Sequence, residues 1–465
     1  MRQRTSVVLL ATFVSAGAWA QDVSGFSTTI AHFSQQNTPG FPSVDLAPFT
    51  EFLGVDATRL GSDALSLHLY GWGVNDLGGP STILGKSGGD LSYAYLDYRF
   101  SQANAEFKAG RFSVNQGAGV EQVDGISGRT DLRCGFNVSA FVGAPVHYKT
   151  QEPPSPSTYT YHYQTDMIIG GRLGLRLGPV GEVGVSYLQD GSSPPWDLAT
   201  PPPVDYTRKQ AGTDLRLAPT AKLELTGHTL FNVANQYQAP GGPVPDGHRV
   251  AEQDYTLRYT LLPTITVTGN YTERNLEAYF AGTNMPNLFR TDVSDRHQAV
   301  GGSVILGSAT ATEVVLDFRH MSRETYGNSD RYGADLRMAA AESKVKYGFG
   351  LHKVSAADLF MPGGSVRAFY GMSREEGRAW VMVEAGKYTA SLDGISYHFD
   401  DGTNPNLNGK SSLCQVVGSV GVKPTENLSL SGDLSYGANA YYQNETSVLL
   451  RTTYRFSAAS KGGSK

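Results

Sequence analysis

Long apolar runs are scarce in this chain of 465 residues, and the clearest one lies at its start. Arg2 and Arg4 precede an apolar run over residues 7–14, and Ala18-Trp19-Ala20 follows it. This order of basic, apolar and small residues predicts a secretory signal peptide, residues 1–20, that is cleaved after Ala20. No later stretch approaches the ~18 uninterrupted apolar residues that a membrane-spanning helix needs, which excludes a helical membrane protein.

Basic residues are outnumbered by acidic ones. Removing Arg2 and Arg4 with the signal leaves 36 Lys and Arg against 43 Asp and Glu, a net charge of about −7. The phosphate backbone repels a chain of this sign, so nucleic acid is not an expected partner. No linker or shift in composition divides the chain, which favours one large repetitive unit.

Signatures of catalysis and of metal or nucleotide binding are also missing. The ten histidines are scattered, and no serine lies in a GxSxG-like context. Gly117-Ala118-Gly119 begins like a dinucleotide loop, but Gln122 stands where that motif needs glycine. Glu121 and Asp124 lack the Asp-x-Asp-x-Asp-Gly ladder of a calcium loop. We therefore expect no enzyme and no metal site, and interpret these glycines as positions of close backbone turns.

What the chain does contain is an alternation with a period of two. Near the C-terminus, Val448, Leu450 and Tyr454 fall on one face of a strand, while Arg451 and Arg455 fall on the other. About twenty such segments, in a chain with 54 Gly, 25 Tyr and 20 Phe, predict an all-β protein. They lie near residues 51–59, 64–75, 90–100, 104–112, 133–143, 166–177, 181–189, 206–217, 220–234, 250–261, 264–274, 296–306, 311–323, 329–338, 342–354, 365–373, 377–389, 411–423, 427–438 and 443–456.

From residue 166 onward, short turns alternate with long polar loops. GPVG (178–181) and REEG (374–377) are among the short turns, and residues 191–205, 238–247 and 392–410 are among the long loops. Alternating strands of about ten residues with this punctuation predict a transmembrane antiparallel β-barrel of about 20 strands in the outer membrane, in contact with its lipid. A secreted β-repeat protein is the alternative.

The barrel is expected over residues 51–456, after an N-terminal periplasmic segment (21–50) and before a flexible C-terminal tail (457–465). Carried backward, the alternation makes residues 113–132 a long connection on the periplasmic side, where the other turns are short. This stretch either folds into the lumen as a constriction or plug, or hangs in the periplasm as a docking surface. A missed strand before residue 133 is the third option, and residues 22–33 offer another strand.

Charged residues in the opening stretch and on the polar strand faces are the candidates for lining the pore or its loop, because lumenal charges set ion preference. The alternative is that they only pair across neighbouring strands. The candidates are Arg111, Glu121, Asp124, Arg129, Asp131, Arg133, Arg172, Arg176, Asp317, Arg319, Arg451 and Arg455.

Cysteine is nearly absent, with only Cys134 and Cys414. Alternation places both on the lipid face, one near each rim of the barrel, so a disulfide between them is not expected. Neither lies in a CxxCH motif, so the chain attaches no haem covalently.

The stretch FKAGRFSVNQGAGVEQVDGISGRTDL, followed by FVGAPV, resembles the porin-like outer-membrane barrels of metal-reducing deltaproteobacteria. The matching positions are Gly110, Arg111, Asp124, Gly125, Phe141, Gly143 and Pro145. The resemblance covers about 35 residues. It implies the pore or sheath of a porin–cytochrome conduit, with periplasmic and extracellular multihaem cytochromes as partners that hold the haem.

Two other functions fit the same pattern of strands. One is a diffusion porin for small solutes, narrowed by residues 113–132, and the other is a structural or adhesive barrel with Pro-rich loops facing the medium.

Overall fold

The structure is a computed structural model of the whole chain. It describes residues 20–37, 43–78, 87–100, 102–117, 119–146, 167–192, 206–235, 250–275, 296–308, 311–323, 327–340, 342, 344–356, 373–400, 409–438 and 444–459.

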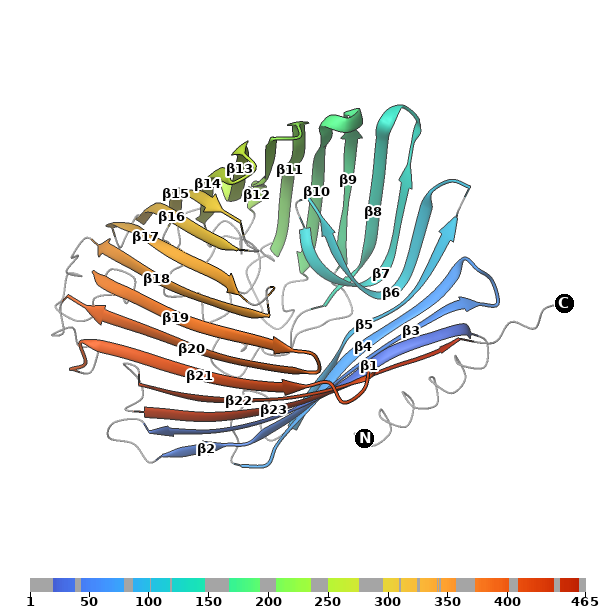
Figure 1. Cartoon of the computed structure of the whole chain (residues 1–465). Helices are drawn as coiled ribbons and strands as arrows, with labels where there is room; N and C mark the ends of the chain where they lie inside the picture. The colour runs from blue at the N-terminus through green and yellow to red at the C-terminus, as the bar shows by residue number, and fades with distance from the viewer. Residues whose placement is uncertain are drawn as a thin grey trace, which may run out of the picture.

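Alternating sequence becomes strand along nearly all of the described chain (Figure 1). The elements are β1 (Ala20–Asn37), β2 (Val44–Leu46), β3 (Pro48–Leu60), β4 (Leu65–Asp76), β5 (Ser87–Phe100), β6 (Ala105–Gln116), β7 (Gly119–Asp131), η1 (Arg133–Gly135), β8 (Phe136–Pro145), β9 (Met167–Arg176), η2 (Gly178–Val180), β10 (Gly181–Ser192), β11 (Tyr206–Thr220), β12 (Leu223–Asn235), β13 (Val250–Leu262), β14 (Ile265–Asn275), β15 (Arg296–Gly307), β16 (Thr312–Arg323), β17 (Gly327–Ala340), β18 (Val345–Ala356), β19 (Arg374–Ala385), β20 (Tyr388–Phe399), β21 (Ser412–Val422), β22 (Leu428–Ala438) and β23 (Asn444–Ala459).

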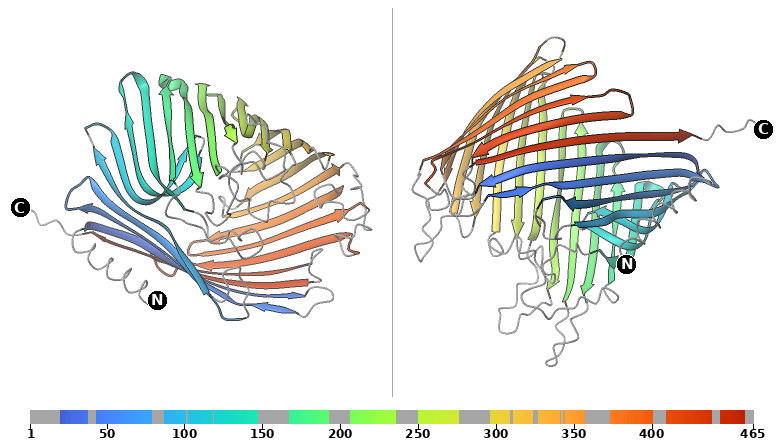
Figure 2. Two further views of the ribbon diagram at one scale, coloured as in Figure 1. Left: turned by 180° about the vertical axis from the view of Figure 1, so that it is seen from behind. Right: turned by 90° about the horizontal axis from the view of Figure 1, so that it is seen from below.

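The sheet closes on itself. Each long strand pairs antiparallel with its neighbours in the chain, and β1 pairs with β23 from Asp22↔Ala459 to Asn37↔Asn444. The short strand β2 pairs only with the end of β1, so the described residues form a closed antiparallel barrel of 22 strands. The predicted fold of about 20 strands is therefore confirmed. Figure 2 shows the first and last strands side by side in both further views.

The two faces of the wall differ in polarity, as the alternation predicted. On β23, Leu450 and Tyr454 are 50% and 49% exposed on the outer face. The same outer face on the other strands carries exposed Leu, Val, Phe and Tyr side chains, such as Phe318, Leu392 and Leu434. On β23, Arg451 and Arg455 fall on the opposite, lumenal face.

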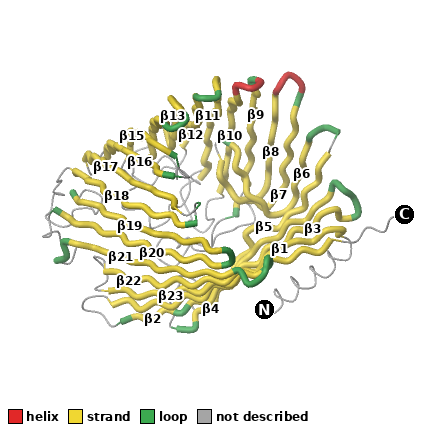
Figure 3. The backbone as a smooth tube through the Cα atoms, in the orientation of Figure 1, coloured by secondary structure: helices red, strands yellow, loops and turns green. Residues whose placement is uncertain are grey.

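One end of the barrel has short connections, and these include the two 3-10 turns η1 and η2, drawn in red in Figure 3. The other end carries most of the longer connections, such as residues 146–166 and 193–205. Among the described residues, no helix is long and apolar enough to cross a membrane, a finding that concerns helices alone.

Several boundaries differ from those predicted. The segment 21–50, expected outside the barrel, supplies β1 and so closes the wall. Residues 374–377, expected as a turn, lie inside β19, and the real turn at Gly386 divides the segment expected as one strand over 377–389. Residues 392–399, expected as loop, belong to β20.

Other predictions fall partly or wholly outside the described residues. The signal peptide up to residue 19, the strand near 365–373, most of the long loops and residues 460–465 of the tail lie there. The start of that tail is strand, because β23 continues to Ala459.

Candidate functional site

The stretch 113–132 is not a long loop. It forms the upper part of β6, a two-residue connection at 117–118 and β7, because Gln116 pairs with Gly119 and Ala105 with Thr130. Strand order also places this connection at the end of the barrel that carries the longer loops, opposite to the predicted side. The option of a missed strand before residue 133 is thus the correct one.

This hairpin leaves the barrel wall partway along its length. The pairing of β5 with β6 stops at Ala94↔Arg111, and the pairing of β7 with β8 stops at Val123↔Pro145. Beyond these points, residues 113–116 pair only with residues 119–122 across the hairpin. Figure 1 shows the pair, in cyan, curving away from the wall toward β10.

Glycines allow the backbone to bend there. Gly110 has φ +125°, a conformation that side chains disfavour, and a Cβ at this position would collide with the carbonyl oxygen of Ala94. Gly125 and Gly143 face each other across β7 and β8, so that a Cβ on either would strike the other strand. These three glycines therefore serve close backbone packing at the bend.

Arg111 links the strands at the bend through hydrogen bonds and ion pairs. Its Nε and Nη2 donate to the two carboxylate oxygens of Asp124, both at 2.7 Å, and its Nη1 donates to the backbone oxygen of Leu91 at 3.0 Å. Asp90 lies 3.4 Å from the same guanidinium. This two-point contact fixes β6 against β7 where both leave the wall.

An apolar cluster holds the hairpin inside the barrel. Phe112, Val114 and Val123 are 2%, 3% and 0% exposed on one face of the hairpin. They pack against side chains that the inner wall presents from five strands. These are Phe141, Ile168, Leu188, Leu230 and Ala251.

The tip of the hairpin lies over β10. A Cβ at Gly117 would collide with Ser186, and one at Gly119 would lie 2.7 Å from Leu188 Cδ1. Both contacts reach across β8 and β9, which shows that the tip projects into the lumen rather than continuing the wall. The stretch therefore lies inside the lumen, but it consists of two strands and enters from the end opposite to the predicted one.

A guanidinium network lies under the tip. Arg172 on β9 donates to Asp214 on β11 through Nη2 at 2.6 Å and Nε at 2.9 Å. Its Nη1 donates to Glu182 at 2.7 Å and to Asn137 at 2.9 Å. The Arg172 side chain is only 14% exposed, so neighbouring strands are tied together around one buried cation.

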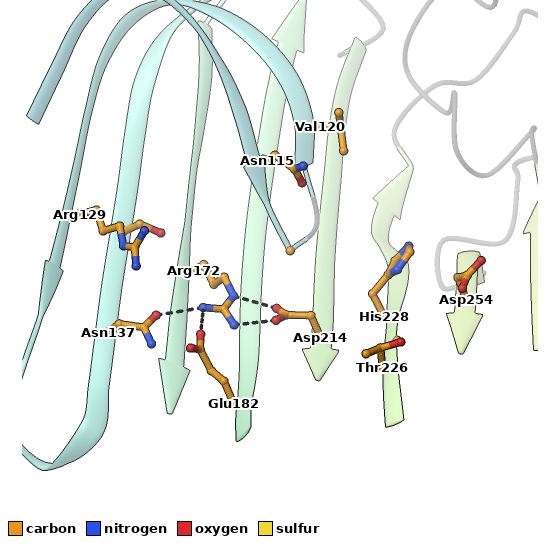
Figure 4. Close-up of a pocket in the computed structure, with 13 residues that line it drawn as sticks. Asn115, Val120, Arg129, Asn137, Arg172, Glu182, Asp214, Thr226, His228 and Asp254 are labelled. Atoms are coloured by element: carbon orange, nitrogen blue, oxygen red, sulfur yellow. Dashed lines mark hydrogen bonds and ion pairs between the residues drawn. The ribbon is translucent and has the colours of Figure 1, made fainter. Parts of the chain in front are cut away.

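This network forms part of the floor of a cavity of about 640 Å³ between the hairpin and the wall. Asn115 and Val120 of the hairpin line it on one side, and Arg129 and Asp254 lie at its opposite ends (Figure 4). Arg129 has no hydrogen bond or ion pair to another described residue. The cavity is polar and lies along the lumenal face.

The other candidate residues divide into paired and partnerless groups. Asp131 accepts from Arg176 at 3.0 Å, and Asp317 accepts from Arg331 at 2.8 Å. Glu121 lies on the hairpin and Arg133 in the turn η1. Three candidates on lumenal strand faces have no partner among the described residues: Arg319, Arg451 and Arg455.

The two cysteines occupy different settings. Cys414 lies on the outer face of β21 beside exposed Val416, as the alternation predicted. Cys134 was expected in a strand but lies in the turn η1 with φ +62°. Both thiols are free and exposed.

The structure also brings together three groups that chain spacing did not connect. Oxygen and nitrogen atoms of Asp317, Asp335 and His352, from three adjacent strands, lie within 4.8 Å of one another. His352 Nε2 already contacts Asp317 at 2.8 Å, and Arg331 neutralises the same carboxylate. The hydrogen bond from His352 and the ion pair with Arg331 therefore account for the cluster.

Sequence reasoning missed Glu182, Asp214 and Asn137, the partners of Arg172. Each lies on the polar face of its predicted strand, so alternation placed it in the lumen. Which polar residues meet depends on register between strands, and the chain alone does not state it.

Comparisons with known proteins establish a similarity of fold and nothing more specific. No protein family and no curated protein matches the chain. A mutant of the ferric enterobactin receptor PfeA of Pseudomonas aeruginosa matches with TM-score 0.56 and 11% identity over 94% of this chain and 80% of that one. OccAB4 of Acinetobacter baumannii matches with TM-score 0.44 and 9% identity over 95% and 99% of the two chains. The match to PfeA therefore shows that the chain is similar in fold to an outer-membrane β-barrel, and it shows the fold alone.

Proposed function

We propose that this protein is an outer-membrane channel through which small polar solutes diffuse. The observation that carries the proposal is the contrast between the two faces of one closed sheet. An apolar outer band suits lipid, and a lumenal face that carries many charged side chains suits water and dissolved ions.

The orientation follows from the ends of the barrel. The start of β1 pairs with the end of β23, so both termini of the barrel lie at the end with the short connections. Short turns are periplasmic in barrels of this kind, which puts the longer connections outside the cell. The hairpin then folds into the lumen from the extracellular end.

The hairpin narrows the lumen without closing it. Strands ~4.8 Å apart and tilted by about 40° give 22 strands a circumference of roughly 140 Å and a backbone radius of about 22 Å. Subtracting a side-chain lining of about 5 Å, half the ~10 Å spacing of packed sheets, leaves roughly 900 Å² of cross-section. A hairpin ~10 Å wide and ~10 Å thick fills about a tenth of it, so the role of plug does not fit this stretch.

The solute channel is preferred over the electron conduit that the sequence resemblance implied. The comparisons lend no support to a cytochrome partner, and the described wall offers a hydrated, charged lining. No enzymatic role is proposed, because the described clusters of charged residues are ion-pair networks along the wall.

Conductance in planar lipid bilayers tests the proposal. The mature chain should give steady, ohmic single-channel currents in KCl, and replacing residues 112–122 by a short Gly-Ser linker should raise the conductance by about a tenth. Lys353, which joins Asp400 at 2.8 Å near the long-loop end of β18, provides the control as Lys353→Gln, with unchanged conductance expected. A sealed barrel that passes no current would overturn the proposal.

A further inference from the structure

A row of aromatic rings crosses the lumenal wall on neighbouring strands near the N-terminus of the chain. This row, the aromatic belt, consists of Phe26, Phe52, Tyr70, Tyr93 and Tyr95. Ring centroids lie 6.0 Å apart for Phe26 and Tyr70, 5.4 Å for Tyr70 and Tyr93, and 5.8 Å for Tyr93 and Tyr95. Phe52 stacks on Tyr70 at 6.5 Å. The belt thus runs without a break over β1, β3, β4 and β5.

The belt faces the lumen. Leu96 and Tyr98, on the opposite face of β5, are exposed toward the outside, so Tyr93 and Tyr95 point inward. Tyr95 also packs against the apolar cluster under the hairpin, which itself lies inside the barrel. All five rings are half-buried, so part of each remains open to the lumen.

A free guanidinium adjoins one end of this belt. Arg455 on β23 is the direct cross-strand partner of Phe26, and directly opposed side chains lie with Cβ atoms roughly 4.5–5.5 Å apart. Arg451 lies four residues before Arg455 on the same face of β23, and it opposes Ile30. Both arginines are exposed and have no hydrogen bond or ion pair to another described residue.

The other end of the belt differs in one respect. Lys108 lies 5.5 Å from the centre of the Tyr95 ring, but Glu106, 3.3 Å away, already neutralises its charge. Among the described residues, the side of the belt with unneutralised positive charge is therefore the Arg455 side. Arg172 shows the contrast, since its charge is fully engaged by Asp214 and Glu182.

We propose that the aromatic belt and Arg455 form a binding site for small aromatic carboxylates, resting on the proposed role of the barrel as a solute channel. The ring of such a solute stacks on Phe26 and Tyr70, and its carboxylate accepts a two-point hydrogen bond from the Arg455 guanidinium. A simple inorganic anion would use the arginine without the rings. A neutral sugar would use the rings without the arginine.

Ligand block of single-channel current tests this site. The mature chain is placed in planar bilayers in KCl, and 4-hydroxybenzoate, acetate, benzamide and maltotriose are added in turn. We expect concentration-dependent interruptions with 4-hydroxybenzoate at concentrations at least tenfold below those at which the other three solutes act.

Variants assign the effect to the belt. Arg455→Gln should raise the half-blocking concentration of 4-hydroxybenzoate about tenfold, and Phe26→Leu about fivefold. Arg258 provides the matched control, because it is a lumenal arginine without a partner among the described residues and lies on β13, away from the belt. Arg258→Gln should leave the half-blocking concentration within twofold, and unchanged conductance without ligand shows that each variant keeps its barrel.

Three results would overturn the site: equal block by acetate, tighter binding of maltotriose, or the same effect of Arg258→Gln and Arg455→Gln. Titration calorimetry of the protein in detergent, with the same ligands and variants, separates this inference from the proposed function. Conduction without 4-hydroxybenzoate binding would refute the site and leave the channel standing. Binding without conduction would support the site and refute the channel.

Discussion

Replacing Phe112 by alanine should release the inward hairpin. Phe112 is the largest side chain on the buried face of the hairpin and is 2% exposed in the cluster with Phe141, Ile168 and Leu188. Phe107, on the same strand β6, is 41% exposed on the outer face and provides the matched control. Only the first of the two substitutions removes a contact between hairpin and wall.

The size of the effect follows from burial. The three buried apolar side chains of the hairpin contribute about 1.5–3 kcal/mol each, or roughly 4.5–9 kcal/mol in total before the entropy of ordering the hairpin is subtracted. Truncating a buried Phe to Ala costs about 3–5 kcal/mol. The substitution therefore removes about half of the docking energy, and the open population should rise by a factor of roughly a hundred or more.

A buried position under the hairpin tip reports the opening. Ser186 is 8% exposed beneath Gly117, so a cysteine in its place is shielded while the hairpin is docked. With Cys134 and Cys414 replaced by serine, Ser186→Cys should react slowly with a charged thiol reagent. Adding Phe112→Ala should accelerate the reaction at least a hundredfold, and adding Phe107→Ala should change it less than twofold. Equal rates for the two double variants would refute the docked hairpin.

Two further pairs of substitutions test the wall. Arg172→Met leaves carboxylates on β10 and β11 without their cation and should lower the free energy of unfolding by about 2–3 kcal/mol, less than for a fully buried pair because the lumen is wet. Arg176→Met, at a guanidinium that is 45% rather than 14% exposed, should cost at most about 1 kcal/mol, and urea unfolding in detergent that shows equal losses would contradict the network. Leu434→Arg, on the outer face at the middle of β22, should cost about 2–4 kcal/mol in lipid. Asp433→Arg, on the lumenal face of the same strand, should cost less than about 1 kcal/mol, and the reverse order in refolding titrations into vesicles would show that the two faces were assigned wrongly.

The barrel could be predicted from the sequence because two regular patterns occur together: apolar and polar residues alternate along each strand, and turns recur at regular intervals. The alternation of side chains defines which face of each strand meets lipid, and the spacing of turns defines how many strands there are. The first strand and some strand boundaries were harder to predict. The strand β1 has few apolar residues among Ser, Thr and Gly, and its partner β23 lies at the far end of the chain, so only closure of the sheet identifies it. The turn at Gly386 is two residues long and interrupts no apolar run, which hid the boundary of β19 and β20.

Contacts between lumenal side chains could not be predicted for a different reason. Alternation correctly put Arg172 on the inner face, but Asp214, its main partner, lies two strands away. A shift of one residue in the pairing of β10 with β11 would place another side chain there. Register comes from the sum of many cross-strand contacts, and no single segment of the chain states it.

The inward hairpin, in contrast, has a signal in the sequence that follows from the physics of the barrel. On β6 the apolar residues change face at Gly110, from Phe107 on the lipid side to Phe112 and Val114 on the lumenal side. The wall under the hairpin carries a matching pattern, because two adjacent residues are both apolar in Ile168-Ile169 and in Tyr187-Leu188, so that each pair puts one apolar side chain on the lumenal face.

A lumenal face in contact with water does not favour such residues, so a change of face in one hairpin and doubled apolar residues on nearby strands indicate that one covers the other. Gly110 marks the place where the apolar residues of β6 change face. In a β-barrel sequence, that change is therefore a better guide to chain folded into the lumen than loop length.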